Sequence, residues 1–73
     1  MANKKALTDD EIDIIRRMAA WNMNVSAVGK NLFISRTATV YRLNRIKKKT
    51  GRDPRRFYDL VELLEMAEEA DNG

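Results

Sequence analysis

Apolar residues recur at helical spacing in four segments of the chain, and short polar stretches separate these segments. The predicted helices span residues 9–21, 25–32, 36–49 and 54–70. In no segment do apolar and polar residues alternate as they do along a half-buried strand. We therefore expect an all-α, four-helix domain, with residues 1–6 and 71–73 disordered at its ends.

Polar residues that cap helices precede each predicted helix. The predicted N-caps are Thr8, Asn24, Ser35 and Asp53. Glu11 completes a capping box with Thr8, because each side chain can bond to the backbone amide of the other. Gly51 follows the third helix at the usual place of a C-terminal glycine, and Pro54 is expected as the first residue of the fourth helix.

The three longest predicted helices each have one apolar face. These faces hold Ile12, Ile15 and Ala19 with Met18 at the edge; Thr39, Leu43, Ile46 and Thr50; and Phe57, Leu60, Val61, Leu64 and Ala67, widened by Leu63. Thr39 places a hydroxyl at a core position. That hydroxyl can donate to the carbonyl oxygen of Ser35, four residues earlier.

The segment around residue 34 has the features of a helix-turn-helix. Two helices that cross steeply need a small residue at the crossing, and Gly29 stands at the predicted crossing. Ile34 and Ser35 supply the apolar residue and the cap that follow the turn. The third helix buries Leu43 and Ile46 and is polar on its other side, as a helix that enters a DNA groove must be.

The charge of the chain is unevenly distributed. Residues 30–56 hold ten basic residues against Asp53 alone, whereas residues 57–73 hold six acidic residues and no basic one. A local charge of +9 attracts polyphosphates such as nucleic acid. The alternative interpretation is a solvated helix face that the acidic segment compensates.

Composition excludes several classes of protein. The chain has neither cysteine nor histidine, so it lacks disulfides, the usual metal ligands and the commonest general base. We expect no enzyme activity, no metal and no cofactor. No apolar run approaches the roughly 20 residues that cross a bilayer, and the basic N-terminus is not followed by the apolar segment of a signal peptide. We expect a soluble, cytoplasmic protein in which residues 1–73 form a single domain.

Four segments closely resemble the C-terminal helix-turn-helix domain of PucR-type regulators, which include activators of purine catabolism and sugar-diacid utilisation. They are Asn24–Ser26, Leu32–Arg36, Tyr41–Ile46 and Thr50–Arg55, followed by Phe57. The strings YRLxRI and TGxDPRxF are the most specific part of a resemblance that covers residues 24–67. It implies a four-helix DNA-binding domain whose third helix reads the major groove.

The chain also departs from the family. The family usually has His or a similar residue, Asn, Thr and Leu where this chain has Ser35, Thr37, Ala38 and Thr39, so the DNA sequence that the family reads does not carry over. PucR-type proteins carry this domain behind a long sensory region, and here only the first helix precedes it. The chain is therefore either an excised domain or a stand-alone chain of the kind found in phages and mobile elements, and we expect the latter.

The exposed side of the third helix supplies the candidate DNA contacts. The residues predicted to contact base edges are Arg36, Thr37, Val40, Tyr41 and Asn44. Those predicted to contact phosphates are Lys30, Arg42, Arg45, Lys47, Lys48, Arg55 and Arg56. Tyr41 has an alternative role, with its ring on a neighbouring helix and its hydroxyl on a phosphate. The alternative role of Arg42 is an ion pair with an acidic residue of the first or fourth helix.

Two apolar residues of the first helix, Trp21 and Ile14, lie off its predicted inward face. Either they pack against the helix at 54–70, or they form a homodimer contact with Leu63 and Met66, which would pair two recognition helices. We expect a sequence-specific, double-stranded DNA-binding transcriptional regulator. The alternatives are a protein-interaction module, such as a phage assembly or packaging factor, and a protein that binds structured RNA.

Overall fold

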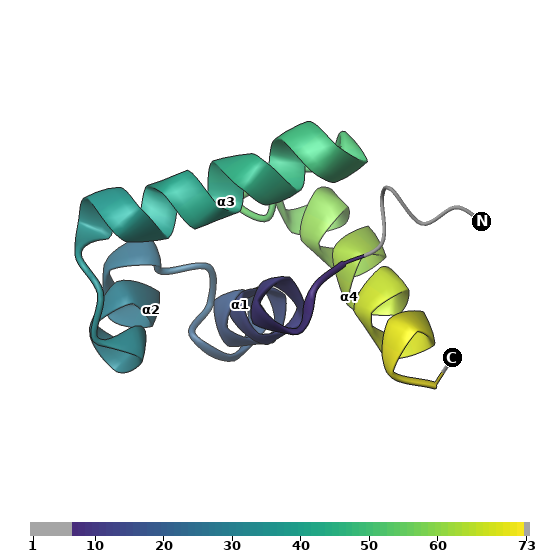
Figure 1. The fold of residues 1–73 in the computed structure, drawn as a ribbon, viewed down its shortest axis with the longest axis horizontal. Coiled ribbons are helices and arrows are strands. Elements are labelled where there is room, and N and C mark those ends of the chain that lie inside the picture. The colour runs from purple at the N-terminus through teal and green to yellow at the C-terminus, as the bar shows by residue number, and fades with distance from the viewer. Residues whose placement is uncertain (1–6, 73) are drawn as a thin grey trace.

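The protein is all-helical, as predicted. The computed structural model describes residues 7–72 and contains α1 (Asp9–Ala20), α2 (Val25–Leu32), α3 (Arg36–Thr50) and α4 (Phe57–Asn72). Figure 1 shows α3 along one side of the molecule, with α2 near its N-terminal end, α4 near its C-terminal end and α1 between them. The disorder expected for residues 1–6 and 73 lies outside the described residues. The backbone at 71 and 72 continues α4, which therefore ends two residues later than predicted.

The predicted caps of the first three helices are present. The Thr8 amide donates to Glu11 Oε1 at 2.9 Å and the Glu11 amide to Thr8 Oγ1 at 3.2 Å, which completes the capping box. The side chains of Asn24 and Ser35 each accept a 3.0 Å bond from the amide three residues later. Gly51 ends α3 in the left-handed conformation, with φ of 78°. These local bonds fix where α1, α2 and α3 begin and where α3 ends.

The fourth helix begins three residues later than predicted. Asp53 Oδ1 accepts the Arg55 amide at 3.0 Å, and the Arg56 amide donates to the Asp53 carbonyl at 2.9 Å, so a tight turn precedes the helix. The Leu60 amide makes the first helical bond, to the Arg56 carbonyl at 2.8 Å. Pro54 therefore lies buried in the turn instead of at the first helical position, and Asp53 does not cap α4.

The core is built around α1, which contacts each of the other helices. Ile14, Ile15 and Met18 are at most 1% exposed. Placing Met18 at the edge and Ile14 off the inward face was wrong, because α2 and α4 lie on opposite sides of α1 and widen its buried face (Figure 1). The other buried apolar residues are Ile12, Val28, Leu43, Ile46, Leu60, Leu63 and Ala67.

The apolar face of α4 is narrower than predicted and rotated toward Leu63. Leu60 and Leu63 are buried, whereas Phe57 and Val61 are exposed. Phe57 is the first helical residue, and its ring meets the edge of the Tyr58 ring at 5.2 Å between centroids. Because α4 packs chiefly against α1, only the strip at spacings of three and four residues becomes buried.

Candidate nucleic-acid interface

The crossing of α2 and α3 leaves no room for a side chain at position 29. Gly29 is buried, and an added Cβ would lie 2.6 Å from Thr39 Oγ1 and 3.3 Å from the Ile34 carbonyl oxygen. The Thr39 hydroxyl donates to the Ser35 carbonyl at 2.8 Å, which is the bond predicted from the sequence. Thr39 is therefore held in place, and the close approach of the two helices depends on glycine.

The turn between α2 and α3 uses a residue that sequence reasoning did not single out. Phe33 adopts the left-handed conformation, with φ of 60°, and 94% of it is exposed. Such a conformation costs roughly 1–2 kcal/mol for a residue other than glycine. The turn is held by bonds from the Ile34 amide to the Gly29 carbonyl at 3.0 Å and from the Phe33 amide to the Lys30 carbonyl at 3.1 Å. No glycine or asparagine marks this position, so the sequence carried no signal for it.

The apolar residues of the motif that follow the crossing are buried or half-buried, as a helix-turn-helix requires. Leu43 and Ile46 are fully buried on the inner side of α3, and Ile34 is half-buried after the turn. The inner side of α3 thus faces the core along its length. The side that remains outside is the one on which the base-contact candidates lie.

The predicted base-contact residues share the outer side of α3. Arg36, Thr37, Tyr41 and Asn44 are exposed, and Val40 is half-buried. The Arg36 guanidinium donates to Ser26 Oγ of α2 at 2.8 Å, which ties the first turn of α3 to the first turn of α2. Tyr41 is 63% exposed. These five residues include hydrogen-bonding side chains of the kinds that read base edges.

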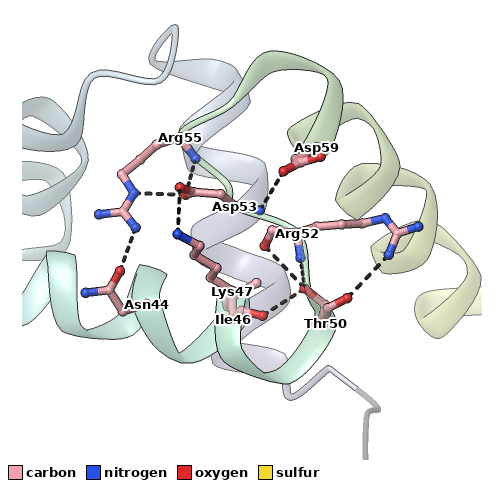
Figure 2. A network of polar contacts seen from close by, with 8 residues as sticks. All are labelled: Asn44, Ile46, Lys47, Thr50, Arg52, Asp53, Arg55 and Asp59. Carbon is pink, nitrogen blue, oxygen red and sulfur yellow. Dashed lines mark hydrogen bonds and ion pairs between the residues drawn. The ribbon is translucent and has the colours of Figure 1, made fainter.

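Asn44 differs from the other four residues because a side chain from the turn before α4 reaches it. The Arg55 guanidinium donates to Asn44 Oδ1 at 2.6 Å and to Asp53 Oδ1 at 2.9 Å, as Figure 2 shows. Lys47 lies 3.9 Å from the same carboxylate. Burial by itself raises the pKa of Asp53, but the hydrogen bonds from Arg55 and the positive charges of Arg55 and Lys47 hold it below its ordinary value.

The predicted phosphate contacts fall into two groups. Five have no ion-pair partner among residues 7–72: Lys30, Arg42, Arg45, Lys48 and Arg56. The other two, Lys47 and Arg55, are both paired with Asp53. Only the first group therefore has charges that no carboxylate of the described residues compensates at close range.

Arg42 does not form the intramolecular bridge that was its alternative role. Within residues 7–72 it has no carboxylate partner on α1 or α4. With Arg45 it lines a hollow of about 250 Å³ against the first turn of α1. The other residues of this hollow are Thr8, Asp10, Glu11 and Ile14.

Lys49 points toward α1 and not toward the outer side of α3. Its ammonium lies 2.7 Å from Glu11 Oε1, and the Glu11 side chain is 7% exposed. Burial raises the pKa of Glu11, but the bonds from Lys49 and the Thr8 amide and the charges of Lys49 and Arg45 outweigh it, so the pKa is lowered. Of the three consecutive lysines, Lys48 alone has no carboxylate partner in the described part of the chain.

The residues of the alternative homodimer contact do not form one surface. Ile14 and Leu63 are buried in the core, which removes both from any contact between copies. Trp21 is 45% exposed and lines a shallow hollow with Ala27, Lys30 and Asn31. Packing Trp21 against the fourth helix was therefore wrong, because the end of α1 turns it toward α2.

No group of three or more acidic, histidine or cysteine side chains is placed to hold a metal ion in residues 7–72. No helix in this part of the chain is both long and apolar enough to cross a membrane.

Comparison with known proteins identifies one family. The family model of the PucR C-terminal helix-turn-helix domain matches residues 13–67. The match is wider than the resemblance seen in the sequence, because it takes in most of α1 as well as the helix-turn-helix and most of α4. No curated protein and no solved structure gives a significant match.

Proposed function

This chain belongs to the family of PucR C-terminal helix-turn-helix domains, and from that premise we propose that it binds double-stranded DNA as a transcriptional regulator. In this proposal α3 enters the major groove and reads a preferred sequence. The proposal implies a cytoplasmic location, where the duplex partner is found.

The observation that carries the proposal is the combination of two kinds of side chain around α3. Its outer side holds exposed hydrogen-bonding residues at helical spacing, and basic residues that have no ion-pair partner among residues 7–72 lie on α2, on α3 and before α4. Base-edge contacts select a sequence, whereas contacts to phosphates position the protein without reading it. A surface that has both kinds in this arrangement suits a duplex groove with its two phosphate strands.

Arg36 tests the sequence-reading part of the proposal. It is exposed at the first position of α3, and its bond to Ser26 holds the guanidinium near the start of both motif helices. A bidentate contact from arginine to guanine discriminates against a wrong base by about 1–3 kcal/mol. We expect Arg36→Ala to remove discrimination at one position of the preferred site and to leave the affinity for random duplex nearly unchanged.

Lys48 provides the matched comparison, because it is exposed on the same helix and has no carboxylate partner among residues 7–72. We expect Lys48→Ala to weaken binding to the selected site and to random duplex by the same factor. Both variants are measured on both duplexes at one salt concentration. Equal losses on both duplexes for Arg36→Ala would show that it contacts a phosphate. Absence of duplex binding by the unaltered protein would contradict the proposal itself.

A further inference from the structure

The Arg55 guanidinium is held by two side chains of its own chain. Its Nε donates to Asp53 Oδ1 at 2.9 Å, and its Nη2 donates to Asn44 Oδ1 at 2.6 Å. Figure 2 shows the guanidinium lying between the two side chains. Arg55 thus joins the turn before α4 to the outer side of α3, and a role limited to a phosphate contact leaves this arrangement unexplained.

The carboxylate that holds Arg55 is itself fixed. The Asp53 side chain is 13% exposed and also accepts the Arg55 amide at 3.0 Å. The Asp53 amide donates to the Asp59 carboxylate of α4 at 3.0 Å. Because the hydrogen bonds from Arg55 keep the pKa of Asp53 below its ordinary value, the carboxylate stays charged at neutral pH.

This arrangement determines which atoms Asn44 presents to the outside. Arginine has only donors, so the Asn44 atom that faces it must be the carbonyl oxygen. The amide nitrogen then lies on the side turned away from Arg55, as seen in Figure 2. A carboxamide in this orientation offers two N–H donors, while its oxygen is already bonded.

We propose that Arg55 and Asp53 are positioning residues that orient Asn44 as a hydrogen-bond donor, so that Asn44 selects guanine over adenine. Guanine presents two acceptors in the major groove, N7 and O6, whereas adenine presents N7 beside an amino group that needs an acceptor. The usual bidentate pairing of asparagine with adenine uses the oxygen that Arg55 engages. The predicted base preference rests on the proposed DNA binding. The orientation of Asn44 is a property of the free protein and does not depend on that proposal.

Substitution by lysine separates positioning from a phosphate contact. Arg55→Lys keeps the positive charge, so a phosphate contact would survive. A lysine ammonium lacks the planar fork that reaches Asp53 and Asn44 at once. Arg17→Lys is the matched control, because Arg17 of α1 likewise donates to one aspartate and one asparagine and is not a candidate DNA contact.

The first measurement uses duplexes selected by the unaltered protein from a random pool. Asn44→Ala identifies the base pair that Asn44 reads, as the position at which discrimination is lost. We expect the unaltered protein to prefer guanine to adenine there by about threefold to tenfold, the size of one added hydrogen bond. We expect Arg55→Lys to abolish or reverse this preference and to leave the affinity for random duplex unchanged, whereas Arg17→Lys changes neither.

The second measurement needs no DNA. In the ¹⁵N-labelled free protein, the side-chain amide group of Asn44 should be rigid, and its order parameter should fall in Arg55→Lys and in Asp53→Asn but not in Arg17→Lys. Asp53→Asn keeps the acceptor of the tight turn and removes the charge, so the fold survives as the test requires.

Two results would overturn the inference. One is an Asn44 amide group that is equally mobile in the unaltered protein and in Arg55→Lys. The other is a guanine preference that Arg55→Lys leaves intact. If the protein binds no duplex, the proposed function fails, and the order parameters still decide whether Arg55 orients Asn44.

Discussion

At the scale of single residues, the geometry of the helix-turn-helix depends on a side chain that is absent. A Cβ on Gly29 would stand 2.6 Å from Thr39 Oγ1, and Thr39 is tied to the Ser35 carbonyl by a 2.8 Å bond. The oxygen belongs to a short, buried side chain and cannot swing away. The crossing of α2 and α3 therefore tolerates glycine and little else.

We expect Gly29→Leu to destabilise the protein. Overpacking at a filled site costs about 1–3 kcal/mol, which is a large part of the stability of so small a domain. The measurement is the free energy of unfolding in urea, followed by circular dichroism. Lys30→Leu is the control, because that neighbouring residue is exposed and its replacement should stay within about 0.5 kcal/mol.

A Gly29→Leu variant that is as stable as the unaltered protein would contradict the geometry of the crossing. So would a Lys30→Leu variant that loses as much stability as Gly29→Leu. Either result would mean that position 29 does not lie between the helices.

Sequence reasoning reached Gly29 and the Thr39 bond because both follow from local rules about helix crossings and back-bonding hydroxyls. It could not reach Phe33, because the left-handed turn there carries none of the residues that usually mark one. Nor could it find the bond between Arg55 and Asn44. Those residues are eleven apart, and their meeting depends on how the chain turns between α3 and α4.

At the scale of helices, boundaries set by local capping were predictable and boundaries set by tertiary partners were not. Thr8, Asn24, Ser35 and Gly51 act within a few residues of themselves, and all four lie where the sequence predicts. Asp53 could cap a helix or close a turn. Its partners Lys47 and Arg55 favour the turn, which moves the start of α4 to Phe57.

The bond between Glu11 and Lys49 joins the first turn of α1 to the last turn of α3. Because the folded protein holds the pKa of Glu11 below its ordinary value, the unfolded chain binds this proton more readily. The stabilisation is complete above the ordinary pKa and is lost as pH falls through the lowered one. Protonating Glu11 thus loosens the contact between the two helices in acid.

We expect Glu11→Gln to lower the free energy of unfolding at neutral pH by about 1.5–3 kcal/mol, the value of hydrogen bonds to charged groups. We also expect a shallower loss of stability than in the unaltered protein between neutral pH and about pH 3. The measurement is urea unfolding at a series of pH values. Glu65→Gln is the control, because Glu65 is exposed on α4 and has no ion-pair partner among residues 7–72.

An unaltered pH dependence in Glu11→Gln would show that this carboxylate does not link α1 to α3. A change of equal size in Glu65→Gln would show that the effect comes from net charge alone.

At the scale of the whole molecule, the two signs of charge are separated along the fold. The basic block of residues 30–56 lies on α2, α3 and the turn before α4, and the acidic residues of 57–73 lie on α4. In Figure 1 α4 leads away from α3. An approaching polyanion is therefore attracted to the α3 side and repelled from α4. The sequence predicted this separation, but only the structure divides the basic residues into paired and unpaired ones.

The most direct test of the account is the salt dependence of the affinity for a random DNA duplex. Five residues have no carboxylate partner in the described part of the chain: Lys30, Arg42, Arg45, Lys48 and Arg56. If each neutralises one phosphate, log K against log salt should have a slope of about −4 to −5, from roughly −0.9 per phosphate. Replacing Arg45 and Lys48 together by Gln should make the slope shallower by about 2. The control is Arg52→Gln, which should leave the slope unchanged because Arg52 pairs with Glu62 at 2.6 Å. An affinity that does not change with salt would contradict DNA binding through this surface.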